Sequence, residues 1–129
     1  MPTRILIVDD SSHVRHALRT CLELHPGWQI CGEAENGLEG IEIAKREAPD
    51  IVLLDYAMPG MNGLETARAI ATTSPRTAIL LFTMYASDQL SSLARQFGVR
   101  AVISKAVGGI NAIVEAIRNA TPEGHEPAA

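Results

Sequence analysis

Three aspartates directly follow apolar runs of the kind found in buried strands. Asp9 and Asp10 come after the run that ends at Val8, and Asp55 follows the run 51–54. Both runs are short and rich in β-branched residues, as in parallel strands that are covered on both faces. Because the carboxyl ends of parallel strands emerge at one edge of a sheet, we expect the three carboxylates to converge. Like charges at close quarters repel one another unless a cation or a proton intervenes, and Mg²⁺, which prefers oxygen ligands, is the expected cation.

Two further polar residues stand at the ends of later apolar runs. Thr83 follows the run 78–82, and Lys105 follows the run 101–104. A lysine offers a mobile positive charge to phosphoryl oxygens, and a threonine offers a hydroxyl donor. Each residue alone has a plainer interpretation, such as a solvated lysine or an aspartate that caps a turn or helix. Their joint placement at strand ends, where open α/β sheets carry their chemistry, favours a functional site.

Segments with helical spacing separate these strands. The apolar positions that mark them are Val14, Leu18, Cys21 and Leu22; Leu38, Ile41, Ala44 and Ala48; Leu64, Ala67, Ile70 and Ala71; Leu90, Leu93, Ala94 and Phe97; and Ile110, Ile113, Val114 and Ile117. Five such βα units predict an α/β fold, a doubly wound five-stranded parallel sheet with five helices. The strands at 29–34 and 101–104 are the more polar ones, which places them at the edges. This predicts the flavodoxin-like strand order 2-1-3-4-5.

These residues, in this order, resemble the receiver domain of two-component response regulators. The matching positions are Asp9-Asp10, Asp55, the segment Asp55-Tyr56-Ala57-Met58-Pro59-Gly60-Met61-Asn62-Gly63, Thr83 and Lys105. Gly63-Leu64-Glu65 and Ala116-Ile117-Arg118 look most like LuxR-type regulators, whose DNA-binding domain follows a linker. We expect a receiver domain over residues 1–120. Residues 121–129 contain no core-forming side chains and are predicted to be a flexible tail or the start of a linker.

The resemblance implies a phosphorylation-controlled switch rather than an enzyme. Asp55 is then the acceptor, since a carboxylate can serve as nucleophile and form an acyl phosphate. The donor is a sensor histidine kinase or a phosphotransfer protein. Asp10 and Asp55 are expected to bind Mg²⁺ directly, Asp9 largely through water, and the backbone carbonyl of Ala57 to add a ligand. Lys105 and Thr83 are expected to contact the phosphoryl group, and a phosphorylation-dependent homodimer is one expected output.

The sequence departs from the family pattern at several positions. Val102 stands where receiver domains usually have an aromatic residue, and Ala106 stands where a proline with a cis bond is frequent. Two positions that modulate the lifetime of the acyl phosphate hold Ala57 and Tyr85. Ala57 cannot orient a hydrolytic water and Tyr85 could shield the phosphoryl group, so we expect slow loss of phosphate.

Other classes of function fit these residues less well. A pseudo-receiver, which has the fold but serves only as an interaction module, is the main alternative. A haloacid dehalogenase type hydrolase needs Asp-x-Asp and a cap insertion, whereas Asp10 is followed by Ser11-Ser12, which is also a poor phosphate loop for a flavin. His13 and His16 lie three residues apart on a helix without an evident third ligand, which favours a solvated face over a metal site.

The length and composition of the chain limit its possible partners and its cellular location. With 129 residues the chain fits one domain, and its net charge of −4, with eleven scattered basic residues, argues against direct binding to nucleic acid. No segment has the roughly 18 consecutive apolar residues of a membrane helix. Cys21 and Cys31 are expected to be buried reduced thiols. These features predict a cytoplasmic protein.

Overall fold

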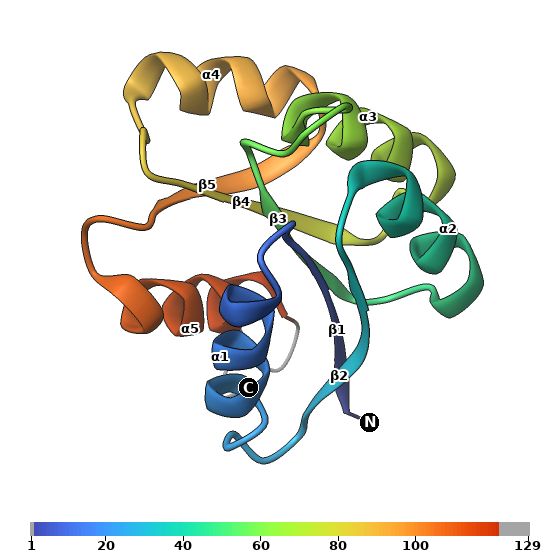
Figure 1. Cartoon of the computed structure of the whole chain (residues 1–129), viewed down its shortest axis with the longest axis vertical. Coiled ribbons are helices and arrows are strands. Elements are labelled where there is room, and N and C mark those ends of the chain that lie inside the picture. Colours follow the sequence, from blue (N-terminus) through green and yellow to red (C-terminus); the bar gives the residue numbers. More distant parts are fainter. Residues whose placement is uncertain (1, 122–129) are drawn as a thin grey trace, which may run out of the picture.

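The computed structural model describes residues 2–121, in which five parallel strands alternate with five helices (Figure 1). The elements are β1 (Thr3–Val8), α1 (Ser12–Leu22), β2 (Trp28–Ala34), α2 (Gly37–Glu47), β3 (Ile51–Asp55), α3 (Gly63–Thr73), β4 (Ala78–Thr83), α4 (Asp88–Gln96), β5 (Val99–Ser104) and α5 (Gly109–Ala120). The strand order is β2-β1-β3-β4-β5, with every pair parallel. The predicted flavodoxin-like fold is therefore confirmed, with β2 and β5 at the edges.

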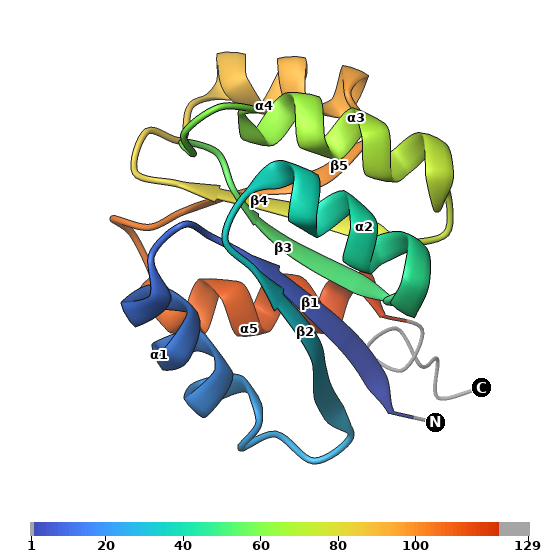
Figure 2. The ribbon, with the colours of Figure 1, turned by 45° about the vertical axis from the view of Figure 1, so that its right-hand side comes forward.

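The sheet lies between two layers of helices (Figure 2). Helices α2, α3 and α4 cover one face, and α1 and α5 cover the other. Side chains alternate between these faces along each strand, since a strand has a period of two residues. On β4, for example, Ile79 and Leu81 pack under α2, α3 and α4, whereas Leu80 and Phe82 pack under α1 and α5. Strand alternation thus decides which side chains can meet at the carboxyl edge.

Side-chain caps fix the start of four helices. The N-cap residues are Ser11, Asn36, Asn62 and Ser87, and each side chain accepts a hydrogen bond from a backbone N–H of the first turn. At α3, Asn62 and Glu65 form a reciprocal capping box, so the loop after Asp55 enters the helix in one defined geometry. Capping of α1 by Asp9 or Asp10, the plainer interpretation of that pair, is wrong, because Ser11 caps the helix.

One prediction from the sequence concerns the end of the chain. Of the tail predicted at 121–129, only Thr121 is described; it is the C-cap of α5 and is buried, and residues 122–129 lie outside the described residues.

Cys21 and Cys31 are free thiols as predicted, but both are half-buried rather than buried. Burial raises the pKa of the Cys31 thiol, although the Arg4 guanidinium opposes this. Within the described part of the chain, each helix is too short or too polar to cross a bilayer.

Candidate functional site

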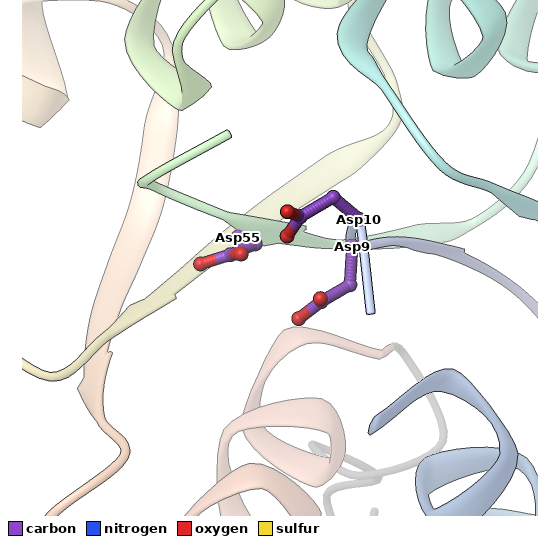
Figure 3. A group of neighbouring side chains, drawn as sticks. All are labelled: Asp9, Asp10 and Asp55. Carbon is purple, nitrogen blue, oxygen red and sulfur yellow. The ribbon is translucent and has the colours of Figure 1, made fainter. Parts of the chain in front are cut away.

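Three carboxylates converge at the carboxyl edge of the sheet, where β1 and β3 end (Figure 3). Asp55 is the last residue of β3, and Asp9 and Asp10 follow the end of β1. Each contributes a carboxylate oxygen to a group whose atoms all lie within 4.8 Å of one another. Asp9 and Asp55 are 1% and 5% exposed, whereas Asp10 is exposed. The predicted convergence is therefore confirmed.

Lys105 is the cation that the chain itself supplies to this cluster. Its Nζ lies 3.2 Å from Asp55 Oδ1, to which it donates a hydrogen bond, and 3.6 Å from Asp9 Oδ2. Its backbone N–H donates to the carbonyl of Thr83, which ties the end of β5 to the end of β4. One ammonium facing three carboxylates leaves the site with net negative charge.

The pKa of the Asp55 carboxyl is raised in this site. Burial raises the pKa of the Asp55 carboxyl, and the nearby charge of Asp9 raises it further. The charge and hydrogen bond of Lys105, together with a hydrogen bond from the Ala57 backbone N–H, oppose the rise without cancelling it. A divalent cation at the cluster would favour the ionised form of Asp55, the form that can act as nucleophile.

The donor set suits a hard divalent cation such as Mg²⁺. Carboxylate oxygens are the ligands it prefers, and one or two of them suffice, because the ion keeps several waters. Asp9 Oδ2 is buried and has no hydrogen-bond partner within residues 2–121, an arrangement that is costly unless a cation or water satisfies the atom. In the same part of the chain, no hydrogen bond or ion pair holds the Asp10 carboxylate, so both of its oxygens can coordinate.

Helix α1 and strand β2 hold Asp9 in place, a contribution that the sequence did not reveal. Asp9 Oδ1 accepts from the Ser11 N–H at 2.8 Å, and the Asp9 carbonyl accepts from Arg15 at 2.6 Å. Glu33 on β2 in turn pairs with Arg15 at 3.1 Å and with Arg19 at 2.6 Å. The spacing of the two arginines, four residues apart on one helix face, was the available signal.

Thr83 and Ala57 occupy their predicted places without a contact that defines their roles. Thr83 is buried at the end of β4, and its hydroxyl accepts from the Tyr85 N–H at 3.1 Å. Ala57 lies two residues beyond Asp55 and is exposed. Two predicted roles therefore remain predictions. One is contact between the Thr83 hydroxyl and the phosphoryl group, and the other is coordination of a metal ion by the Ala57 carbonyl.

The departures from the family pattern also have defined places. Val102 is half-buried and packs against the core under α4, so it replaces the usual aromatic residue by a smaller apolar contact. All peptide bonds of the described residues are trans, including the one before Ala106. Tyr85 is 77% exposed beside the site, on the loop after Thr83.

One aromatic residue of the site was missed in the sequence. Phe82, next to Thr83, is buried, and the Nζ of Lys105 lies over its ring, 4.7 Å from the centroid. The sequence shows Phe82 only as the last residue of an apolar run. His13 and His16, by contrast, are both exposed, and the only group of candidate metal ligands among residues 2–121 is the aspartate cluster.

The fold and the site together define a flavodoxin-like α/β domain with an acidic, lysine-flanked edge. The chain matches the response regulator receiver domain over residues 5–118, and it belongs to that family. Receiver domains are signalling modules rather than enzymes, and they work in two-component systems with histidine kinases. The family predicted from the five matching positions is therefore confirmed.

Similar proteins span several kinds of regulator. The chain is 37% identical over 108 residues, 83% of its length, to protein-glutamate methylesterase/protein-glutamine glutaminase 4 of Myxococcus xanthus, of which it spans 31%. A two-component response regulator of the LuxR family from Aurantimonas superposes with a TM-score of 0.86 at 30% identity, covering 92% of this chain and 84% of that one. The CheX-CheY-BeF3-Mg+2 complex from Borrelia burgdorferi gives 0.83 at 25% identity, covering 92% and 89%. Among the curated relatives compared, the chain spans 21% to 52% of their length.

Proposed function

We propose that this chain is a phosphoacceptor switch, in which Asp55 takes a phosphoryl group from the phosphohistidine of a sensor histidine kinase or a phosphotransfer protein. The convergence of three carboxylates with the Lys105 ammonium at 3.2 Å from Asp55 is the observation that carries the proposal. Such a site has the parts that phosphoryl transfer needs, which are a nucleophile, a place for a divalent cation and a positive charge beside the nucleophile.

The transfer itself follows from these groups. A carboxylate oxygen of Asp55 forms a bond to phosphorus while the bond from phosphorus to the donor nitrogen breaks, and the imidazole leaves with the electron pair. Lys105 stands beside Asp55, where its ammonium can neutralise phosphoryl oxygens as they arrive, and Thr83 is proposed to donate its hydroxyl. Asp10, Asp55 and the Ala57 carbonyl would hold Mg²⁺ directly and Asp9 largely through water, and the ion would supply further charge neutralisation.

Labelling by a small phosphodonor tests the proposal. Incubation with acetyl phosphate and Mg²⁺ is expected to add one phosphoryl mass, and EDTA is expected to prevent it. Intact mass spectrometry at neutral pH measures both. Failure of the folded chain to accept phosphate with Mg²⁺ present would instead favour the alternative, a pseudo-receiver that only binds partners.

Divalent-ion binding is expected to depend on Asp10 more than on Asp9. The Asp10 carboxylate is exposed, whereas Asp9 is buried and already engaged by the Ser11 N–H and Lys105. Loss of even an outer-shell partner typically costs a metal site about 10- to 100-fold in affinity. We therefore expect at least about a tenfold loss of Mg²⁺ affinity in Asp10→Asn and a smaller loss in Asp9→Asn. Calorimetric titration of the two isosteric variants compares them directly, and equal retention in Asp10→Asn would contradict the assignment.

The partners and output extend the proposal beyond the site. We infer a cytoplasmic setting, a receiver unit over residues 1–120, and an output that is either a LuxR-type transcriptional response or a phosphorylation-dependent homodimer. The likeness to the Aurantimonas regulator supports the LuxR-type output. The edge strand β5 is open to a partner, because grooves of about 520 Å³ and 190 Å³ flank it on the sides of α5 and α4.

Phosphorylation is expected to act on the face built by α4, β5 and α5. The Thr83 hydroxyl holds the Tyr85 N–H, so moving that hydroxyl toward a phosphoryl group removes the hydrogen bond that shapes the β4-α4 loop. That loop leads into α4, in which Ala94 is the one fully buried residue of the helix. Val102 fills less space than the usual aromatic residue, so we expect a population shift of modest size rather than an all-or-none change.

Hydrogen exchange locates this change. With beryllofluoride and Mg²⁺, faster exchange is expected within residues 84–105, beginning with the Tyr85 amide, and α2 should not change. Asp55→Asn under the same conditions is the control, since it keeps the fold and loses the site of the mimic. Changes confined to α1 and α2, with residues 84–105 unaltered, would show that the chain signals in another way.

A further inference from the structure

Within residues 2–121, the Lys105 ammonium interacts with two carboxylates and one aromatic ring. Nζ lies 3.2 Å from Asp55, 3.6 Å from Asp9, and 4.7 Å from the centroid of the Phe82 ring. A cation over the face of an aromatic ring is attracted by the negative charge of that face, within about 6 Å of the centroid. The ring is sheltered, since Phe82 is 2% exposed, whereas the Lys105 side chain is 25% exposed; attraction of this kind is stronger where water is excluded.

The sheet register places the ring there. Phe82 pairs with Asp55 on β3 and with Ile103 on β5, so its side chain emerges between the acceptor and the strand that ends before Lys105. Side chains at positions 51 and 53 of β3, 80 and 82 of β4, and 103 of β5 share the face under α1 and α5. Residues 55 and 105 continue the alternation on that face. The ring and the lysine also line one cavity of about 240 Å³ between α1 and α5.

The two kinds of neighbour respond differently when the site is in use. A divalent cation at the cluster offsets two of the three carboxylate charges, so the attraction of Asp9 and Asp55 for the ammonium falls. The ring face is not a metal ligand and keeps its attraction. With the cation bound, Phe82 therefore supplies a larger share of the attraction that holds Lys105 close to Asp55, which is where the ammonium must stand when phosphoryl oxygens arrive.

We propose that Phe82 is a positioning residue for Lys105, acting through the face of its ring. This inference rests on the proposed function, because it assigns Phe82 a part in the same phosphoryl transfer. Phe82 touches neither donor nor metal in this role. Its effect is to raise the fraction of molecules in which the ammonium is beside Asp55.

Graded fluorination separates this role from simple packing. Fluorine withdraws electron density from the ring face and changes its shape little, so a series of mono-, di- and trifluorophenylalanine at position 82 weakens the cation contact stepwise. We expect a progressive fall in both the acetyl phosphate labelling rate and the affinity for beryllofluoride with Mg²⁺, reaching about five- to tenfold for the trifluoro ring. The same series at Phe97 is the control, because that ring carries Arg68 at 4.3 Å on the opposite face of the sheet.

The outcomes are distinct. A flat series at position 82, or an equal slope at position 97, would overturn the positioning role. A parent protein that accepts no phosphate would overturn the proposed function instead. In that case, magnetisation transfer between the fluorine of 4-fluorophenylalanine at position 82 and the Lys105 side chain decides the role alone. Transfer that persists after addition of Mg²⁺ supports the role, and transfer that disappears on that addition overturns it.

Discussion

Replacing Asp55 by asparagine is expected to abolish labelling by acetyl phosphate and Mg²⁺. Asp55 is the one carboxylate of the cluster that is the last residue of a strand. Its carboxylate accepts hydrogen bonds from the Lys105 ammonium and from the Ala57 N–H. Asparagine keeps the shape and removes the nucleophilic oxygen. Undiminished labelling of Asp55→Asn, measured by intact mass spectrometry, would contradict the assignment of Asp55 as the acceptor.

Asp50→Asn is the matched control, because Asp50 precedes the same strand at its opposite end. Its Oδ2 accepts from the Arg4 N–H, a bond that an asparagine oxygen can also accept, so labelling should persist.

The same Asp55→Asn substitution should stabilise the fold when no divalent cation is present. The pKa of the Asp55 carboxyl is raised, chiefly by burial, so the folded state holds this proton more tightly than the unfolded chain does. Stability contributed by the protonated form is therefore lost as pH rises through the folded-state pKa. At neutral pH the asparagine variant should have the higher denaturation midpoint, and the difference should shrink as pH falls below the raised pKa. Urea denaturation of the parent and the variant, in EDTA, at neutral pH and at a pH below the raised pKa, measures the difference.

The fold was predictable because its evidence is repeated along the chain. Buried strands such as β3 and β4 appear as continuous apolar runs, and helical spacing follows each one, so errors at single positions do not change the topology. The order of the strands followed from the polar residues of β2 and β5. Only the boundaries moved: β2 begins at Trp28 and β5 at Val99, since backbone pairing to their neighbours starts there.

The site was predictable only for residues that stand at strand ends. Asp9, Asp10, Asp55 and Lys105 converge as expected, because position in the strand alone determines where they emerge. Asp9 is buried and Asp10 is exposed because the two side chains point in different directions after β1 ends. Two adjacent aspartates in a sequence do not indicate which of them will be buried.

The roles of Phe82 and Arg15 did not follow from the sequence for a different reason. Their roles arise from pairing across elements that are distant in sequence, Phe82 with Asp55 and Lys105, and Arg15 with Glu33. An apolar run and a helix face record only that such residues are buried or exposed. The contacts of Phe82 can be deduced only when the register between strands is known, and the Arg15–Glu33 pair only when the packing of α1 against β2 is known.

Gly63→Ala is expected to be the most disruptive single-methyl change at the site. Gly63 begins α3, and a Cβ there would lie 2.7 Å from the Asp55 carbonyl oxygen, 2.8 Å from Tyr56 Cα and 2.9 Å from Leu81 Cδ1. Two of these atoms are backbone and cannot rotate away, so β3 and α3 must separate. Overpacking of this kind typically costs about 1–3 kcal/mol, and we expect the upper end, about 3 kcal/mol, in the free energy of unfolding.

The matched control is Gly40→Ala on α2, where the contacts at 3.0 and 3.2 Å are methyl groups of Val8 that can shift. There the gain in helix propensity of about 1 kcal/mol offsets the crowding, so the net change should be small. Because Gly63→Ala displaces the backbone carbonyl oxygen of Asp55, the proposed acceptor, this variant should also label more slowly at temperatures where it is folded. Urea denaturation and acetyl phosphate labelling of both variants test the two effects, and equal stability of Gly63→Ala and Gly40→Ala would show that the loop after Asp55 adapts freely to the α3 start.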